Sequence, residues 1–152
     1  MTQEIRAITE DVLNACTDLY IEVFNQEPWN DSWTEDTALK RLRHISLTPG
    51  FVGFSLYEKG ELAGFVAGYR EQWFDSEHFD LVEFCIRTGR QGNGYGSALL
   101  HHLEQHLSHI GVSRIYLLTM RAGQAEAFYK KNNYDVNGHM VMMGKKLGAG
   151  KS

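Results

Sequence analysis

The sequence contains few cysteines and no long apolar run. Cys16 and Cys85 are its two cysteines, and they lack the C-x-x-C spacing of metal and redox sites. They are interpreted as reduced, buried residues, with Cys85 as a nucleophile the less favoured alternative. No apolar run approaches the roughly 18 residues of a membrane span, and residues 1–6 lack the start of a signal peptide. The sequence therefore predicts a cytoplasmic protein without a membrane partner.

Basic residues are missing from a long N-terminal stretch. Between Arg6 and Lys40 there are eight acids and no Lys or Arg. Residues 1–83 have 16 acids against 6 bases, and residues 84–152 have 3 against 9. This asymmetry predicts an anionic cofactor on one side and a cationic acceptor on the other, although any single acid could equally serve to solvate the surface. No basic stripe interleaved with aromatics is present, so nucleic acid is not predicted as a partner.

The length of 152 residues and the apolar fraction of 43% predict one globular domain. We expect this domain to span residues 1–147, followed by a flexible tail at 148–152. Residue periodicity and turn formers give the order βααβββαβαβ, an α/β sandwich with a mixed, mostly antiparallel sheet. The predicted strands are 3–8, 51–57, 62–69, 79–87, 113–120 and 136–147, and the helices are 9–24, 34–46, 94–107 and 123–132.

A glycine-rich segment lies between an apolar strand and a helix. Residues 90–97 hold three glycines in five positions, after the strand at 79–86 and at the start of the helix at 94–107. Glycines let a ligand approach the backbone closely, and the first turn of a helix has unpaired N–H groups and a partial positive charge. The segment therefore predicts a site for the phosphates of a nucleotide-like cofactor.

The spacing of this segment narrows the choice of cofactor. A dinucleotide fingerprint requires a third glycine where Ser97 stands, and an acid that the strand at 114–119 does not supply. The residues that do fit a pattern are Gln91, Gly94 and Gly96, as Q/R-x-x-G-x-G/A. This is the pattern of the GNAT acetyltransferases, which the chain resembles.

The resemblance extends beyond the glycine-rich segment. Residues 83–86 resemble the fourth strand of the family, which separates from its neighbour and hydrogen-bonds the pantetheine arm of acetyl-CoA. Residues 125–134 resemble its A-x-x-x-[YF]-K-x-G-[FY] segment. Two positions depart from the family: Gly123 replaces an Asn that often contacts the cofactor, and Asn133 replaces a Gly, which is benign because both tolerate a left-handed helix C-cap.

The resemblance implies an acetyl-CoA-dependent N-acetyltransferase with the GNAT fold, similar to the small bacterial aminoglycoside-acetylating enzymes. The cofactor is expected to bind the main chain of the strand and of the glycine-rich segment. The predicted cofactor-binding residues are Phe84, Cys85, Ile86, Gln91, Gly92, Asn93, Gly94, Tyr95, Gly96 and Ser97.

Two residues are candidates for proton transfer. Tyr129 stands where the family often has a tyrosine facing the cofactor sulfur, and a phenol with a pKa near 10 can protonate a thiolate. Glu83 is the candidate base, on the same strand face as Leu81, Cys85 and Arg87 by alternation. Tyr129 as a core aromatic, and Glu83 as a salt-bridge partner of Arg87, are the structural alternatives. Water relaying the proton would make a bound base unnecessary.

The resemblance also implies where the acceptor binds. Glu27, Trp29, Trp33 and Glu71 lie in segments that line the acceptor site of the family. Aromatic walls and carboxylates suit a cationic amine, although the tryptophans could equally anchor loops to the core. Four histidines crowd the helix at 94–107 and its end, but no accompanying ligand set supports a metal, and a solvated face is the preferred interpretation.

We therefore expect acetyl transfer to a primary amine of a small cationic acceptor, aminoglycoside-like or polyamine, by direct attack in a ternary complex. Two alternatives remain open: acetylation of a lysine or N-terminal amine of a peptide or protein, and a non-catalytic acyl-CoA-binding sensor. A monomer or a homodimer fits the sequence equally.

Overall fold

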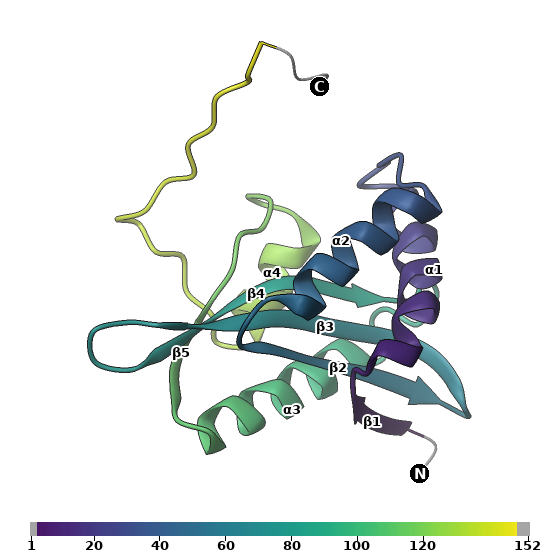
Figure 1. Ribbon diagram of the computed structural model, residues 1–152, viewed down its shortest axis with the longest axis horizontal. Coiled ribbons are helices and arrows are strands. Elements are labelled where there is room, and N and C mark those ends of the chain that lie inside the picture. The colour runs from purple at the N-terminus through teal and green to yellow at the C-terminus, as the bar shows by residue number, and fades with distance from the viewer. Residues whose placement is uncertain (1–2, 149–152) are drawn as a thin grey trace. The chain divides into compact units, whose positions relative to one another are not determined.

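The computed structural model describes residues 3–148. Strands and helices follow the predicted order as far as the last helix (Figure 1). The strands are β1 (Gln3–Ala7), β2 (Phe51–Glu58), β3 (Glu61–Gln72), β4 (Glu77–Ile86) and β5 (Val112–Tyr116). The helices are η1 (Glu10–Val12, a 3-10 turn), α1 (Leu13–Phe24), α2 (Glu35–Leu47), α3 (Tyr95–His109) and α4 (Gln124–Lys131).

The five strands form one mixed sheet in the order β1-β2-β3-β4-β5. The first four are antiparallel to their neighbours, and β5 runs parallel to β4. Antiparallel strands can be joined by short turns, whereas a parallel pair requires a long crossover, which α3 supplies here. The predicted α/β class with a mostly antiparallel sheet is therefore confirmed.

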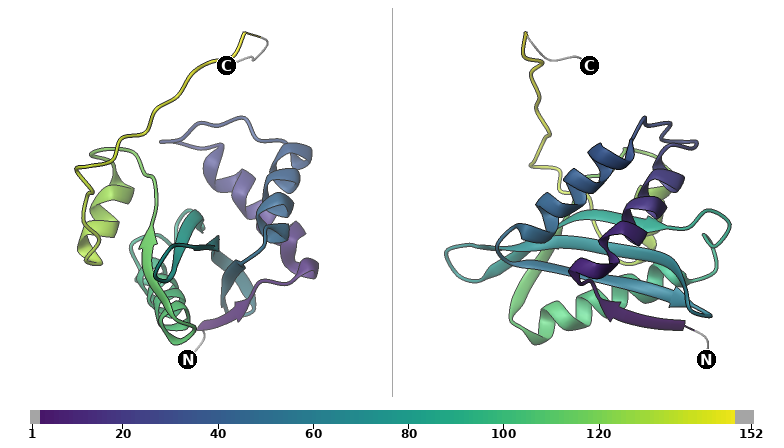
Figure 2. Two further views of the ribbon diagram at one scale, coloured as in Figure 1. Left: turned by 60° about the vertical axis from the view of Figure 1, so that its left-hand side comes forward. Right: turned by 45° about the vertical axis from the view of Figure 1, so that its right-hand side comes forward.

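Helices cover both faces of this sheet: α1 and α2 lie on one face and α3 on the other (Figure 2). Strand alternation divides the core accordingly, so that Phe65 packs under α1 and α2 while Val66 points to the α3 side. The sequence predicts that Leu99, Leu103, Leu107 and Ile110 form the buried face of α3. The three leucines are buried, but Ile110 is 39% exposed, because the helix ends at His109 and Ile110 is its C-cap. The cluster under α1 and α2 includes Cys16, Leu19, Tyr20, Val23, Leu42, Ile45, Phe65, Ala67 and Cys85.

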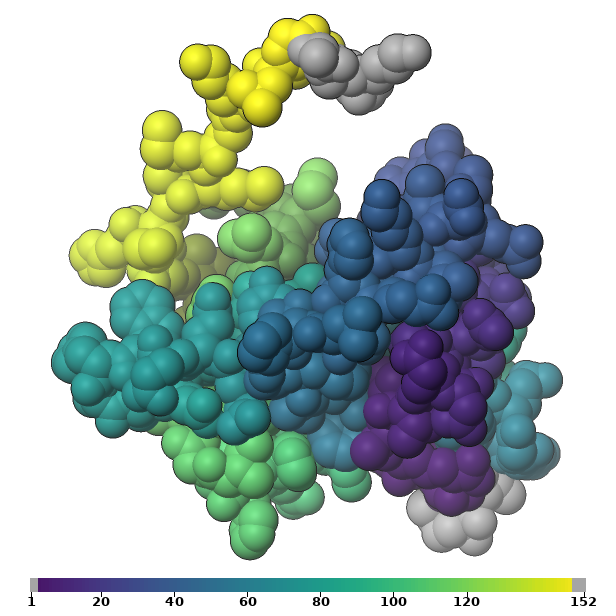
Figure 3. All heavy atoms as spheres, in the orientation of Figure 1, coloured from purple at the N-terminus to yellow at the C-terminus, as the bar shows by residue number. Residues whose placement is uncertain are grey.

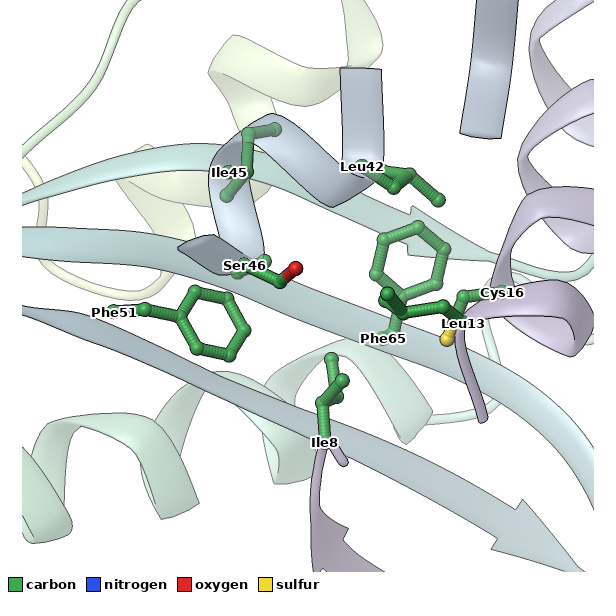
Figure 4. A pocket seen from close by; sticks show the side chains of 9 residues that line it. Ile8, Leu13, Cys16, Leu42, Ile45, Ser46, Phe51 and Phe65 are labelled. Atoms are coloured by element: carbon green, nitrogen blue, oxygen red, sulfur yellow. The ribbon is translucent and has the colours of Figure 1, made fainter. Parts of the chain in front are cut away.

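A small cavity of about 10 Å³ lies in the core between the sheet and the helices α1 and α2 (Figure 4). Leu13, Leu42, Phe51 and Phe65 line it, together with the thiol of Cys16, whose pKa is raised by burial to about 12. An apolar space of roughly one water molecule is too small for a substrate. It is a packing imperfection, and the binding chemistry must be found elsewhere.

The strand predicted at 136–147 is not formed, which corrects the sequence analysis. An Asn137-Gly138 turn interrupts the segment: the His139 N–H donates to the Asn137 side chain (2.9 Å) and the Met140 N–H to the Asn137 carbonyl (3.5 Å). Asn and Gly favour such turns, and an apolar run by itself does not provide the partner strand that a ladder requires. Strand β5 likewise ends at Tyr116, before the predicted limit of 120.

The chain is grouped into two compact units, Met1–Leu118 and Thr119–Ser152. The first unit contains the whole sheet with α1, α2 and α3. In the second, α4 begins after Gly123, and Glu126 accepts the Ala122 N–H and pairs with Lys130 (3.1 Å). The single domain at 1–147 stays a prediction. Of the predicted tail at 148–152, residues 149–152 lie outside the described residues.

Candidate functional site

The glycine-rich segment ends in an open helix N-terminus. Gly92 and Gly94 have positive φ angles of 84° and 82°. Apart from the residues adjacent in the chain, no atom of the described residues lies within 4 Å of where a Cβ would stand on either glycine. Gly94 is the N-cap of α3, and the first intrahelical bond is donated by the Ala98 N–H to its carbonyl (3.0 Å). The N–H groups before Ala98 thus point out of the helix end. This arrangement fits a phosphate group.

Charged contacts fasten this segment to the hairpin of β2 and β3. The Glu58 carboxylate accepts hydrogen bonds from the Tyr95 hydroxyl and the Arg90 guanidinium, and Arg90 also pairs with Glu61 (3.0 Å). The glycine-rich segment is therefore held in position by the β2–β3 hairpin. None of these partners was predicted, because they are about thirty residues apart and only the sheet brings them together.

Strands β4 and β5 separate next to the glycine-rich segment. Their pairing ends at Asp80 and Tyr116, although β4 continues along β3 to the pair of Gly64 with Ile86. The Gln91 side chain donates to the Ile86 carbonyl (3.0 Å), which joins the segment to the end of β4. An extended ligand with amide groups could bind along a strand edge of this kind. The predicted cofactor residues 84–86 lie in this part of β4.

Glu83 is buried in the first unit, with 7% of its surface exposed. Its Oε2 accepts a hydrogen bond from the Tyr20 hydroxyl (2.9 Å) and another from Nε of Arg41. Burial raises the pKa of Glu83, while Arg41 and the hydrogen bonds partly oppose this change. Arg87 pairs instead with Glu22 (3.0 Å), so the salt bridge between Glu83 and Arg87 that was the alternative interpretation is not formed.

A β-bulge reverses the alternation of β4 just before Glu83. Ala67 pairs with Glu83, but the next residue, Gly68, pairs with Leu81, so Val82 has no opposite residue in the register. Glu83 therefore points to the α1 and α2 side and Leu81 to the α3 side. The prediction that Leu81 shares the face of Glu83 is wrong, because an inserted residue leaves no mark in the apolar pattern.

Cys85 remains on the face of Glu83 and is 1% exposed. Burial raises the pKa of its thiol well above the usual range, with the Glu83 charge as a second cause. A thiol that is difficult to ionise is a poor nucleophile. The structure thus favours the buried-residue interpretation of Cys85.

A second group of polar side chains extends along the same sheet face beyond Glu83. Tyr69 of β3, Asp80 of β4 and Tyr116 of β5 are register neighbours, and Glu71 follows Tyr69 on its face. The Tyr116 hydroxyl donates to Glu71. Burial raises the pKa of Asp80, and the Glu71 charge adds to this. Within residues 3–148, neither carboxylate forms an ion pair.

The predicted acceptor tryptophans are packed against α1. Trp33 meets the Tyr20 ring edge-on at 5.1 Å, and Trp29 meets Phe24 at 4.9 Å. Both contacts support the interpretation that these residues anchor a loop. The contact with Tyr20 also places Trp33 beside a residue that hydrogen-bonds Glu83. Glu27 is exposed. Acceptor binding by Glu27, Trp29, Trp33 and Glu71 stays a prediction.

An open groove of about 300 Å³ runs along α2. Its lining residues are Trp33, Thr37, Lys40, Arg41, His44 and Ile45. Arg41 thus faces the groove and also contacts Glu83. The groove therefore gives a ligand access to the residues that surround the buried carboxylate.

The hairpin between β3 and β4 projects from the sheet (Figure 3, teal). At its tip Phe74 is almost fully exposed, and the Trp73 ring stacks on His78 at 4.9 Å. The predicted strands end at residue 69 and resume at residue 79, but β3 runs to Gln72 and β4 begins at Glu77. This longer hairpin is what places Glu71 and Asp80 on paired strands.

Tyr129 lies in the second unit and is 8% exposed. Its ring lies 5.3 Å from that of Phe128 and 5.5 Å from that of Tyr134, and its carbonyl accepts the Tyr134 N–H (2.9 Å). These contacts are those of a packed aromatic residue. Its role as general acid stays a prediction.

The histidines of α3 are not uniformly solvated. His102 and His106 pack edge-on against Phe54 at 4.6 and 5.2 Å, whereas His101 and His109 are exposed. In the described part of the chain, no three His, Cys, Asp or Glu side chains are grouped so that they could hold a metal ion. No helix of residues 3–148 is long and apolar enough to cross a membrane.

Three residues of this site were not identified from the sequence: Tyr20, Arg41 and Asp80. Tyr20 and Arg41 come from separate helices, and their meeting at Glu83 has no local sequence signal. Asp80 did have a local sequence signal. It is an acid flanked by apolar residues in the run 79–86, and the same feature singled out Glu83.

Comparison with known proteins agrees with this geometry. Residues 13–134 match the acetyltransferase (GNAT) family. No curated protein sequence matches the chain.

Solved structures share the fold at low sequence identity. An integron cassette protein from V. cholerae superposes with a TM-score of 0.82 at 16% identity, covering 97% of this chain and 94% of that one. An aminoglycoside acetyltransferase from an uncultured soil metagenomic sample, in complex with sisomicin, gives 0.75 at 15% identity over 96% and 97%. Glucosamine-6-phosphate N-acetyltransferase from Arabidopsis thaliana gives 0.68 at 18% identity over 96% and 99%. The family match covers most of the chain, and we conclude that the chain belongs to the GNAT acetyltransferase family and is an acyltransferase.

Proposed function

We propose that this acyltransferase moves an acetyl group from acetyl-CoA to a primary amine of a small cationic acceptor, by direct attack in a ternary complex. The observation that carries the proposal is the acidic sheet face. Glu71, Asp80 and Glu83 lie on one side of β3 and β4, and only Glu83 has a cationic partner among the described residues. A cationic amine would complement the remaining carboxylates.

The cofactor is held by main-chain groups in this proposal. The N–H groups at the start of α3, after Gly94, would bind the pyrophosphate, and β4 from Phe84 to Ile86 would bind the pantetheine amides. When bound, acetyl-CoA supplies an activated thioester. The hairpin contacts of Glu58 with Arg90 and Tyr95 keep this binding surface in position.

Proton transfer is assigned to two side chains. Glu83 accepts a proton from the acceptor ammonium, directly or through water, because a neutral amine is required for attack. A carboxylate whose pKa is raised by burial is better matched to this role than a solvated one. Tyr129 donates a proton to the departing sulfur.

Structural neighbours suggest which amines to test first. One neighbour is an aminoglycoside acetyltransferase with sisomicin, and another acetylates glucosamine 6-phosphate. The acceptors named for these two proteins are aminoglycosides and an amino sugar, so we place both classes at the head of the acceptor panel, followed by polyamines.

We also propose a cytoplasmic location and a monomer or homodimer.

The decisive experiment measures acetyl-CoA-dependent thiol release with aminoglycosides, amino sugars, polyamines, amino acids and lysine peptides. Wild type is compared with Tyr129→Phe, and Tyr134→Phe serves as the matched control on a neighbouring ring. We expect one cationic class to be turned over, with kcat at least about tenfold lower in Tyr129→Phe only. Acetyl-CoA binding without turnover of any acceptor would favour a sensor.

A second candidate function is acetylation of a peptide amine. The open groove along α2 favours it, because a polypeptide requires a long accessible surface. Turnover of lysine peptides in preference to small amines would establish this candidate in place of the first.

A further inference from the structure

We propose that Arg41 and Tyr20 are positioning residues that hold the Glu83 carboxylate ionised and oriented to take the proton of the acceptor amine. This inference rests on the proposed function, because it concerns the base of that reaction. It assigns a role to two helices, α1 and α2, that otherwise only cover the sheet.

The geometry fixes one oxygen of the carboxylate. Both hydrogen bonds that Glu83 accepts within residues 3–148 go to Oε2, from the Tyr20 hydroxyl at 2.9 Å and from Nε of Arg41. Two donors from different helices restrain the rotation of the carboxylate about its terminal bond. The Oε1 atom is then the oxygen on which a proton can be placed.

The surroundings of Glu83 have opposing effects on its pKa. Burial and the negative charge of Asp31 raise the pKa of Glu83, whereas Arg41 and the hydrogen bond from Tyr20 lower it. Cys85, the remaining titratable neighbour, stays neutral because burial raises the pKa of its thiol. Arg41 is therefore the one cation that favours the ionised carboxylate among the described neighbours.

Arg41 is also the point at which solvent reaches this cluster. Its side chain is 41% exposed, and it lines the groove along α2, while the Glu83 side chain is only 8% exposed. Tyr20, by contrast, is 4% exposed, and its ring centroid lies 6.4 Å from that of Phe65 in the core. The Arg41 guanidinium therefore joins the solvent-filled groove to the buried carboxylate.

The proton step balances without another reactant. The acceptor ammonium gives one proton to Oε1 of Glu83, leaving a neutral amine and a neutral carboxylic acid. The amine nitrogen would then bond to the thioester carbonyl carbon as the carbon–sulfur bond breaks. One N–H proton would pass from this nitrogen to the leaving thiolate through the proposed acid Tyr129, so that an amide and a free thiol are formed. Glu83 returns its proton to solvent after the product leaves.

The first test follows the ionisation of Glu83 itself by carboxyl carbon-13 NMR, with the signal assigned from Glu83→Gln. We expect the titration midpoint in Arg41→Gln to rise by about one pH unit or more, with a smaller rise in Tyr20→Phe. Arg41→Lys, which retains the charge, should restore a midpoint near that of wild type. Arg43→Gln is the matched control: it removes the same charge from α2, but Arg43 pairs with Glu10 (3.6 Å).

The second test is the pH dependence of kcat/KM with an acceptor that wild type turns over. The acidic limb of the kcat/KM profile should move to higher pH in Arg41→Gln, by as much as the carboxyl midpoint of Glu83 moves in the NMR titration. In Arg43→Gln this limb should not move. A carboxyl midpoint unchanged in Arg41→Gln would overturn the inference, and so would a shifted midpoint with an unshifted limb. Lack of turnover by wild type would instead refute the proposed function, and the titration would still decide the contact of Arg41 with Glu83.

Discussion

Glu83 and Asp80 have similar neighbours in the sequence but different neighbours in the structure. Glu83 and Asp80 lie three residues apart in β4, yet the bulge between them makes them neighbours on one sheet face. Glu83 is held by Arg41 and Tyr20, whereas Asp80 has no ion pair within the described residues. Two acidic residues on one strand therefore have different surroundings, which is why we propose different roles for them, Glu83 as a base and Asp80 as a contact for a cation.

Asp80 provides a prediction about pH and stability. Its pKa is raised above 3.8, chiefly by burial, so the folded state holds this proton more tightly than the unfolded chain does. That contribution to stability is fully present below pH 3.8 and is lost as the pH rises through the folded pKa.

We therefore expect Asp80→Asn to gain thermal stability relative to wild type as the pH is raised from 3 to 7. Tm measured across this range in the two proteins checks it. Asp75→Asn, which removes the same charge at the exposed hairpin tip, should show no such trend. A difference in Tm between Asp80→Asn and wild type that stays the same from pH 3 to pH 7 would contradict this prediction.

At the scale of single elements, α2 shows how one helix serves two purposes. Its N-cap Thr34 forms a capping box with Thr37, and Ala38, Leu42 and Ile45 form its buried face. Burial of this face holds α2 on the sheet, and that in turn places Arg41 next to Glu83.

Leu42 tests the importance of this packing. It is 4% exposed and borders the core cavity, so Leu42→Ala should lower the free energy of unfolding by about 2–5 kcal/mol. Leu47→Ala is the matched control, because Leu47 is 69% exposed on the same helix and should change stability by less than about 0.5 kcal/mol. Urea unfolding of both variants decides the matter. Equal losses would show that α2 is not held by its buried face.

The junction of the glycine-rich segment with α3 carries a second prediction at this scale. Gly94→Ala should weaken acetyl-CoA binding about tenfold or more, because a methyl group would occupy space that the phosphate needs, at a φ of 82°. Gly60→Ala is the control, with a φ of 80° and open space in a hairpin turn.

Each alanine should lower stability by about 1 kcal/mol through the left-handed backbone, but only the change at Gly94 should alter the Kd. Calorimetric titration with acetyl-CoA and thermal unfolding separate the two effects. Equal affinities in the two variants would exclude Gly94 from the cofactor site.

On the scale of the whole molecule, charge is divided along the chain. Residues 1–83 carry 16 acids and 6 bases, and residues 84–152 carry 3 acids and 9 bases. In the first unit the acids Glu71, Asp80 and Glu83 share the sheet face under α1 and α2, while the N-terminus of α3 follows the glycine-rich segment. Opposite charges on the two substrates would match this division.

We therefore expect the KM for a polycationic acceptor and the KM for acetyl-CoA both to rise several-fold as salt is increased from about 20 to 300 mM. Screening of attraction between opposite charges is the physical reason. An uncharged osmolyte at equal osmolality is the control and should leave both constants unchanged. A salt-independent KM for the acceptor would argue against recognition by the acidic face.

The sequence by itself determined the elements up to α4 and the glycine-rich junction. Apolar periodicity and turn residues act locally, so α1 to α3 and the hairpin of β2 with β3 could be predicted from short windows. The motif formed by Gln91, Gly94 and Gly96 was also local, and it indicated the family that residues 13–134 match.

Tertiary structure alone decided which side chains meet. The bulge at Val82 set the face of Glu83, and the packing of α1 and α2 supplied Tyr20 and Arg41 as its partners. Arg87, the alternative partner considered from the sequence, pairs with Glu22 instead. The segment at 136–147 illustrates the same limit, since it was predicted as the closing strand of the sheet and an Asn137 turn interrupts it. Contacts between residues far apart in sequence depend on register and helix docking, and neither leaves a signal in the chain read residue by residue.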